Sequence, residues 1–179
     1  MFLADNEILQ AVNNNTVHIR DFDPSRLQVA SYDVLLGNKF IITEKHSTKI
    51  VDPVNKIFAT TREITVPNGE EFVLHPNETV LGEIYDFVGS DDYLIQIGGK
   101  SSLARIGLIV HNTAGVVNPG HYLNIVLELA NLSPIPIILR PRMEIAQLLF
   151  SQLTSKPSKS YSQIGRYANH NWDNFQAKK

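Results

Sequence analysis

The sequence predicts an all-β protein with a single domain, built as a β-sandwich, barrel or jelly roll. Short runs of β-branched or alternating apolar residues recur at near-regular spacing from residue 17 to residue 150. Turn-forming residues such as Pro67-Asn68-Gly69 separate these runs. No long helical pattern alternates with them, which argues against a doubly wound α/β sheet. The chain has 179 residues, of which 43% are hydrophobic, so it can bury one core.

The chain opens with one short helix, predicted for residues 6–12. Ile8, Leu9 and Val12 lie at helical spacing there, and Asn13-Asn14-Asn15 end the pattern. A single helical turn is expected at residues 102–106. The predicted strands are residues 17–19, 31–36, 39–42, 63–66, 71–74, 79–84, 93–97, 108–110, 124–132, 135–139 and 146–150.

The last segment, residues 151–179, is expected to form a flexible C-terminal tail outside a β domain of residues 1–150. Its apolar density is low, but Tyr161, Tyr167, Trp172 and Phe175 are scattered through it. A frayed terminus and a lid that orders over a ligand or a neighbouring subunit are both compatible with this composition. The aromatic residues favour the lid, because a disordered tail has little use for them.

Composition excludes several classes of function. A formal net charge of −2 argues against a broad basic face for nucleic acid. No apolar run approaches the roughly 20 residues of a membrane helix, and the acidic start of the chain is unlike a signal peptide, so a cytoplasmic protein is expected. The chain has no cysteine, which excludes disulfides, a thiolate nucleophile and a zinc site with cysteine ligands.

Residues 98–105, Gly-Gly-Lys-Ser-Ser-Leu-Ala-Arg, combine features that suit a phosphate group. The two glycines let backbone amides approach a ligand, Lys100 and Arg105 supply charge, and two serines supply hydroxyls at a helix start. The motif is not a Walker A loop, because Leu94 stands where the first glycine is required. A tight turn before a helix with a serine N-cap explains the same residues equally well.

Two further features are candidates for chemistry. The strand around Glu128 alternates so that Ile125, Leu127 and Leu129 share one face, while Glu128 lies on the other. A carboxylate in such a strand faces solvent, pairs with a cation or acts as a general base. The second feature is the loop of residues 111–120, which ends in an Asn-Pro-Gly turn. We interpret His111 in it as a hydrogen-bonded structural histidine, because no other His, Asp or Glu lies at metal-binding spacing nearby.

Taken together, the motifs resemble those of the dCTP deaminase family in the dUTPase-like superfamily. They follow in the right order across nearly the whole chain. The matching segments are residues 31–40 (SYDVLLGNKF), 99–105 (GKSSLAR), 107–108 (GL), 111–115 (HNTAG), 119–120 (PG), 126–129 (VLEL), 145–148 (IAQL) and 166–167 (RY).

The resemblance implies a β-clip or distorted jelly-roll fold of the dUTPase-like type. It further implies a homotrimer with active sites between subunits, which hydrolyses dCTP to dUTP and ammonia. Mg²⁺ would be carried by the triphosphate rather than by protein side chains, and dTTP is a candidate inhibitor through residues 111–114. Zinc is not expected, since the zinc deaminases need an H-x-E and C-x-x-C signature that this chain lacks.

The resemblance also assigns residues. Glu128 matches the catalytic Glu that deprotonates the water attacking C4 of cytosine. Ser101 and Arg105 match residues that position this water and stabilise the addition step. The residues expected to contact the substrate are Lys100, Ser102, Leu103, Ala104, Ala114, Asn118, Val126, Leu127, Gln147, Tyr161, Arg166 and His170.

Asn118 departs from the pattern of the related enzymes that hydrolyse dUTP, which carry Asp in this turn. An amide cannot act as the base for a water that attacks phosphorus. The sequence therefore favours a deaminase that stops at dUTP over a bifunctional deaminase–dUTPase that yields dUMP and pyrophosphate. A catalytically silent nucleotide-binding trimer is the third alternative. His121 and Leu123 also replace an aromatic residue and a glycine usual before the catalytic Glu.

Overall fold

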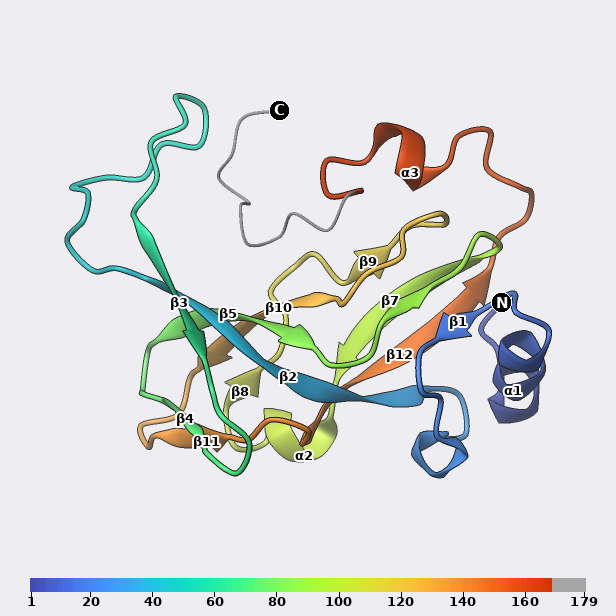
Figure 1. Cartoon of the computed structure of the whole chain (residues 1–179), viewed down its shortest axis with the longest axis horizontal. Coiled ribbons are helices and arrows are strands. Elements are labelled where there is room, and N and C mark those ends of the chain that lie inside the picture. The colour runs from blue at the N-terminus through green and yellow to red at the C-terminus, as the bar shows by residue number, and fades with distance from the viewer. Residues whose placement is uncertain (169–179) are drawn as a thin grey trace.

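The computed structural model describes residues 1–168 and consists mostly of β-strands, which confirms the all-β prediction (Figure 1). The helices are α1 (Asp5–Asn13), a 3₁₀ turn η1 (Pro24–Arg26), α2 (Ser101–Ala104) and α3 (Tyr161–Ile164). The strands are β1 (His18–Ile19), β2 (Tyr32–Thr43), β3 (Thr61–Thr65), β4 (Phe72–Leu74), β5 (Thr79–Ile84), β6 (Val88–Gly89), β7 (Tyr93–Gly99), β8 (Leu108–Ile109), β9 (Val116–Val117), β10 (Val126–Asn131), β11 (Ile137–Leu139) and β12 (Glu144–Gln152).

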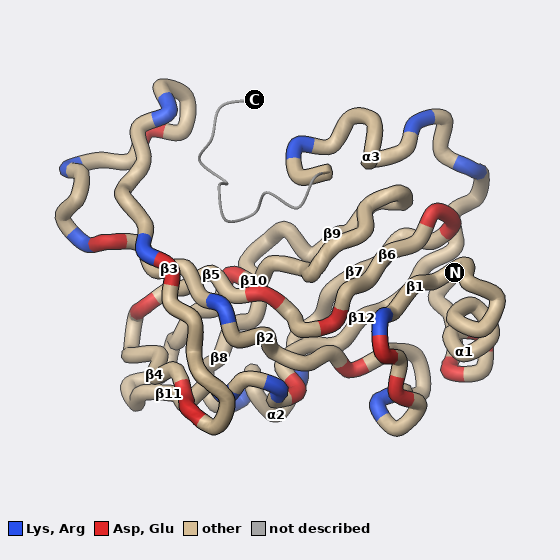
Figure 2. The backbone as a smooth tube through the Cα atoms, in the orientation of Figure 1, with Lys and Arg blue, Asp and Glu red and all other residues tan. Residues whose placement is uncertain are grey.

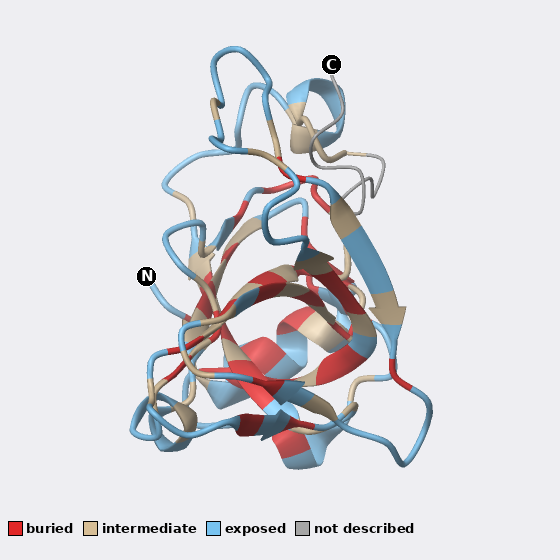
Figure 3. Ribbon diagram, turned by 90° about the vertical axis from the view of Figure 1, so that its left-hand side faces the viewer, coloured by how far each residue is buried: buried red, intermediate tan, exposed pale blue. Residues whose placement is uncertain are grey.

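One eight-stranded sheet forms the body of the molecule. Its strand order is β8-β10-β5-β2-β12-β7-β9, with β3 paired to β2 as well. The pairs are antiparallel, and two short ribbons, β1-β6 and β4-β11, complete the fold. The long strand β2 pairs with β12 through its first residues and with β5 and β3 through its later ones. The sheet therefore curls around the buried core (Figure 3).

Apolar side chains that alternate along the strands build the core. In β10 the exposure alternates residue by residue, with Leu127 and Leu129 fully buried and Glu128 between them only partly buried. Phe40 on β2 stacks on Phe72 at a centroid distance of 4.5 Å. These contacts explain why the segments with period-2 alternation form strands, since each strand buries one face in the core.

Two local predictions were wrong. Residues 31–36 and 39–42 were predicted as separate strands with a turn at Gly37, but β2 runs unbroken through both, with a register irregularity between Leu36 and Phe40. A Cβ on Gly37 would lie 2.9 Å from the Glu83 carbonyl oxygen, so the glycine allows close strand approach rather than a turn. The helical turn expected at residues 102–106 begins at Ser101, with Lys100 rather than a serine as N-cap.

Figure 2 shows basic residues spread along the chain rather than gathered on one element. Within residues 1–168, no helix has the length and apolar character needed to cross a membrane.

A buried ion pair connects η1 with Asp86, which lies between β5 and β6. Arg26 Nη1 lies 2.8 Å from Asp86 Oδ1, and their side chains are only 10% and 0% exposed. We expect Asp86→Asn to lower the free energy of unfolding by about 3–5 kcal/mol, because it leaves the Arg26 charge buried without its partner. Urea denaturation measures this loss. Glu71→Gln breaks the exposed Arg140 pair and should cost less than about 1 kcal/mol; equal losses in both variants would contradict the prediction.

Candidate active site

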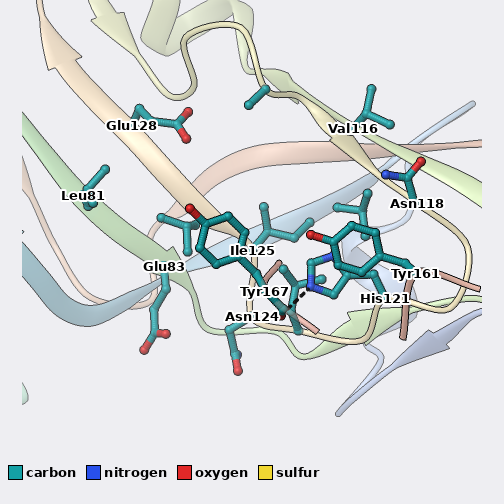
Figure 4. Close-up of a pocket in the computed structure, with 14 residues that line it drawn as sticks. Leu81, Glu83, Val116, Asn118, His121, Asn124, Ile125, Glu128, Tyr161 and Tyr167 are labelled. Atoms are coloured by element: carbon teal, nitrogen blue, oxygen red, sulfur yellow. Dashed lines mark hydrogen bonds between the residues drawn. The ribbon is translucent and has the colours of Figure 1, made fainter. Parts of the chain in front are cut away.

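A cavity of about 530 Å³ opens beside the outer face of β5 and β10 (Figure 4). Strands β5, β9 and β10, the turn that follows β9, and the C-terminal segment around α3 contribute its walls. The lining residues are Leu81, Glu83, Ala114, Val116, Val117, Asn118, His121, Leu123, Asn124, Ile125, Val126, Glu128, Tyr161 and Tyr167. Its volume fits a small organic ligand, because such sites range from about 300 to 1,000 Å³.

Glu128 lies on the cavity side of β10, as the alternation predicted. Its Cα partner across the sheet is Leu81 of β5, and the next outward pair is Val126 with Glu83. The backbone N–H of Asn112 donates a hydrogen bond to Glu128 Oε2 at 3.2 Å. Figure 4 shows the Glu83 side chain turned away from that of Glu128. Glu128 is therefore a partly buried carboxylate, held at one oxygen and placed in the wall of an open cavity.

A tight turn holds Asn118 at the rim of the cavity. The N–H of His121 bonds the carbonyl of Asn118 at 3.1 Å, and Gly120 N–H bonds the carbonyl of Ser90 at 2.8 Å. Gly120 has φ +81°, and a Cβ there would collide with the Ser160 hydroxyl. Gly120 therefore serves both the left-handed turn and the close approach of the C-terminal segment. The Asn-Pro-Gly turn predicted from sequence is present.

The C-terminal segment closes part of the cavity. The Tyr161 ring stacks on His121 with centroids 4.0 Å apart and planes 19° apart. The carbonyl of Tyr167 lies 3.2 Å from His121 Nε2 (Figure 4), where the tautomer with a proton on Nε2 donates a hydrogen bond. Arg166 lies next to this contact, with its guanidinium 5.5 Å from the Tyr167 ring centroid. Predicted residue His170 lies outside the described part of the chain.

The other predicted residues form a second group around α2, outside the cavity wall. Ser101, Ser102, Ala104 and Arg105 are exposed, and Leu103 packs against the core. Lys100 Nζ donates to Asp33 Oδ2 at 2.5 Å and to Glu144 Oε2 at 2.6 Å.

Gln147 belongs to the same group. It accepts a hydrogen bond from Ser31 Oγ at 3.1 Å and donates one to the Gly99 carbonyl at 3.3 Å. The predicted residues thus divide into a Glu128 group and an α2 group. Leu127 belongs to neither by its side chain, which is buried in the core.

Sequence reasoning missed several lining residues. His121 and Tyr167 form the contact with the C-terminal segment, yet His121 was noted only as a departure from the family pattern. The signal that could have identified it is a histidine where an aromatic ring is usual, which keeps the capacity to stack. Glu83 and Leu81 were missed because β5 precedes β10 by more than 40 residues, and single-strand patterns do not reveal which strands pair.

His111 was predicted to be hydrogen-bonded, but it is partly buried and its Nδ1 is a buried atom without a hydrogen-bond partner among the described residues. Within residues 1–168, no group of three or more His, Asp or Glu side chains is placed to hold a metal ion. The polar side chains that line the cavity are carboxylates, amides, the His121 imidazole and tyrosine hydroxyls.

Comparison with known proteins gives consistent results. Residues 2–153 match a family model described as dCTP deaminase-like. The chain is 41% identical over 162 residues to a protein of Tropheryma whipplei strain Twist named dCTP deaminase, dUMP-forming, covering 90% of this chain and 83% of that one. A protein of the same name from Clavibacter michiganensis is 40% identical over 169 residues, covering 94% and 84%.

Among solved structures, a dCTP deaminase from Agrobacterium tumefaciens superposes with a TM-score of 0.63 at 20% sequence identity. The match covers 83% of this chain and 46% of the Agrobacterium chain. This likeness shows the fold, a curled, mostly antiparallel β structure with a short N-terminal helix.

Proposed function

Because the chain belongs to the dCTP deaminase family, it is an enzyme that deaminates dCTP, and we propose that it carries the product on to dUMP. The two relatives, each matched by this chain over more than 80% of its length, are named dUMP-forming. Their names favour the bifunctional reaction over our sequence-based expectation of a deaminase that stops at dUTP. The observation that carries the deamination step is Glu128, a partly buried carboxylate in the wall of the cavity.

In the proposed deamination, Glu128 takes a proton from a water molecule as the oxygen attacks C4 of cytosine. This proton then passes to the amino group, the C4–N bond breaks and ammonia leaves, while the proton of the added hydroxyl moves to N3 as the C4 carbonyl of uracil forms. The Asn112 N–H would fix the orientation of the carboxylate, which is what a general base needs before it can act. The chain has no cysteine, so a cysteine-ligated zinc cannot activate this water.

Ser101 and Arg105 remain proposed partners of Glu128, supplied by a neighbouring subunit. Both are exposed on or just after α2 and do not line the cavity of their own chain. An exposed Arg and Ser can complete a cavity on a second copy, as the proposed homotrimer with sites between subunits requires. Arg105 would stabilise negative charge that develops on the attacked ring.

We propose that Mg²⁺ enters with the nucleotide. The described residues offer it no cluster of acidic and histidine ligands, and Mg²⁺ commonly binds through substrate phosphates and water. It would neutralise charge on the phosphate oxygens. Inhibition by dTTP through residues 111–114 stays a prediction, as does a cytoplasmic location.

A second candidate function is a deaminase that stops at dUTP, and Asn118 favours it. Its amide lies at the rim of the cavity and cannot act as a base. A dUMP-forming reaction would need another group to activate the water that attacks phosphorus.

A chromatographic assay with dCTP and Mg²⁺ separates the two functions. We expect dUMP and pyrophosphate to appear together from the wild-type protein. If dUTP accumulates instead, Asn118→Asp should raise the rate of dUMP formation about 10²-fold above that of the wild type, because it supplies the missing base. Asn118→Ala is the matched control, since it removes the amide without adding a carboxylate. Accumulation of dUTP in the wild-type protein would overturn the dUMP proposal.

The C-terminal segment is proposed to act as a lid over the nucleotide. Truncation after Ser160 removes the Tyr161 and Tyr167 rings from the cavity wall, so we expect the KM for dCTP to rise about tenfold while the oligomer stays intact. Steady-state kinetics and size-exclusion chromatography measure these two effects. Tyr161→Phe keeps the ring and its stacking on His121 and loses only the hydroxyl, so its KM should rise less than that of the truncated protein. A normal KM in the truncated protein would remove the lid from the mechanism.

A further inference from the structure

We propose that His121 is a positioning residue that holds the C-terminal segment, residues 160–167, against the cavity. Its ring stacks on Tyr161, and its Nε2–H donates to the carbonyl of Tyr167 (Figure 4). The inference rests on the proposed lid function and names the residue that keeps the lid in place. It is compatible with contact between the His121 ring and the nucleotide, because His121 also lines the cavity.

The C-terminal segment docks on the turn formed by residues 118–121. The N–H of Tyr161 donates to the Pro119 carbonyl at 3.1 Å. The Ser160 hydroxyl occupies the space that a Cβ on Gly120 would fill. The backbone and a side chain of the segment therefore both lie against this turn, and His121 is its last residue.

His121 contacts the segment at the start of α3 and again beyond its end. The stack on Tyr161 has a centroid distance of 4.0 Å, and Nε2 lies 3.2 Å from the Tyr167 carbonyl oxygen. A carbonyl can only accept, so this hydrogen bond requires a proton on Nε2. His121 is 7% exposed, and low exposure to water strengthens a hydrogen bond. Two contacts on either side of α3 fix its orientation as well as its position.

Helix α3 depends on these contacts for its place on the molecule. It has four residues, none of them buried, so no apolar face fixes it on the core. The Ser160 N–H donates to Gln163 Oε1 at 3.2 Å, which supports the turn itself but not its position. A single helical turn has little stability of its own, because forming the first turn is unfavourable. The position of the segment therefore depends on the turn that ends at His121.

The same turn links the segment to the nucleotide side of the cavity. The N–H of His121 donates to the Asn118 carbonyl at 3.1 Å, and Asn118 is an expected substrate contact at the rim. Tyr161 and Tyr167 line the same cavity. A segment that is already held leaves less to be ordered when dCTP binds, which favours affinity. Loss of the His121 contacts should therefore raise KM and leave the chemical step at Glu128 little changed.

His121→Phe tests the hydrogen bond alone, because it keeps a ring for the stack and loses the donor to Tyr167. We expect the KM for dCTP to rise about fivefold, the typical worth of one hydrogen bond, while kcat stays within about twofold. His121→Ala loses both contacts and should raise KM about tenfold, as expected for truncation after Ser160. Steady-state kinetics measures both variants.

The chain truncated after Ser160 provides the background that isolates the segment. His121→Phe has no segment to release there, so KM should stay within about twofold of the truncated parent. A fivefold rise in the truncated chain as well would overturn the proposal, because the Nε2–H would then act on something other than the segment.

Gly165→Ala tests the stack without changing either ring. The Gly165 N–H donates to the Tyr161 carbonyl at 2.7 Å, and a Cβ on Gly165 would collide with the Tyr161 ring. Gly165 has φ −71°, which alanine adopts freely, so the methyl group should act by displacing the ring from His121. We expect KM to rise about fivefold. Ser162→Ala, at an exposed position of the same helix, is the matched control and should stay within about twofold of the wild type.

Amide hydrogen exchange of residues 161–167, followed by mass spectrometry, separates this inference from the lid function. We expect exchange about fivefold faster in His121→Phe and in Gly165→Ala than in the wild type, whatever reaction the enzyme performs. Unchanged exchange in His121→Phe would refute the role of His121. Faster exchange with an unchanged KM would keep that role and refute the lid.

Discussion

Glu128→Gln is expected to lower kcat for dCTP deamination by about 10³-fold while dCTP still binds. The substitution keeps the shape of the side chain and its hydrogen bond from the Asn112 N–H, but an amide cannot accept the proton of the attacking water. General-base catalysis contributes about 10²–10⁴-fold, so most of the rate should be lost. Because the loss occurs in the chemical step, kcat should fall much more than the affinity. Steady-state kinetics together with calorimetric titration of dCTP separates the two quantities.

Glu83→Gln is the matched control for this prediction. Glu83 lies on the same cavity wall, diagonal to Glu128 across the β5–β10 pair, but its side chain is turned away from Glu128 (Figure 4). We expect its kcat to stay within about threefold of the wild type, as for a residue outside the proton transfer. If Glu83→Gln were the inactive variant and Glu128→Gln the active one, the base would be Glu83. Retained turnover in both variants would rule out Glu128 as the general base.

Much of the Glu128 side of the site could be predicted from the sequence because local patterns determine it. Period-2 alternation places Leu127 and Leu129 in the core and so turns Glu128 outward, and the structure confirms this burial. The Asn-Pro-Gly turn follows from backbone preferences at Gly120, whose φ is +81°. Neither feature needs knowledge of which strands are neighbours.

Features that depend on long-range pairing could not be predicted. The residue types at Lys100 are those of a phosphate site, but its partners Asp33 and Glu144 lie 67 and 44 positions away along the chain. Only the β2–β12–β7 order brings them together. The turn predicted at Gly37 was wrong for the same reason. The glycine is needed there because Glu83 of another strand approaches closely, not because the chain turns.

The second large effect is expected when two inactive variants are combined. Glu128→Gln and Arg105→Ala should each be nearly inactive alone, yet mixed trimers of the two should recover about a third of the wild-type activity. The reason is the separation of the two groups: Glu128 lines the cavity of its own chain, whereas Arg105 is exposed outside it. If each site takes Glu128 from one chain and Arg105 from its neighbour, every mixed trimer has both groups in about a third of its sites, that is, in one of three.

Co-expression of the two variants with different affinity tags, followed by tandem purification, isolates the mixed oligomers for the assay. The matched control replaces one partner with the double variant Glu128→Gln/Arg105→Ala. The double variant takes the place of the Arg105→Ala chain. Every chain in this mixture then carries Glu128→Gln, so no site has an intact Glu128. Activity in the first mixture and none in the second would therefore require Arg105 to act across a subunit boundary. Inactive mixed oligomers in the first would mean that Glu128 and Arg105 must belong to one chain, and α2 would then have to move to the cavity of its own subunit before the reaction.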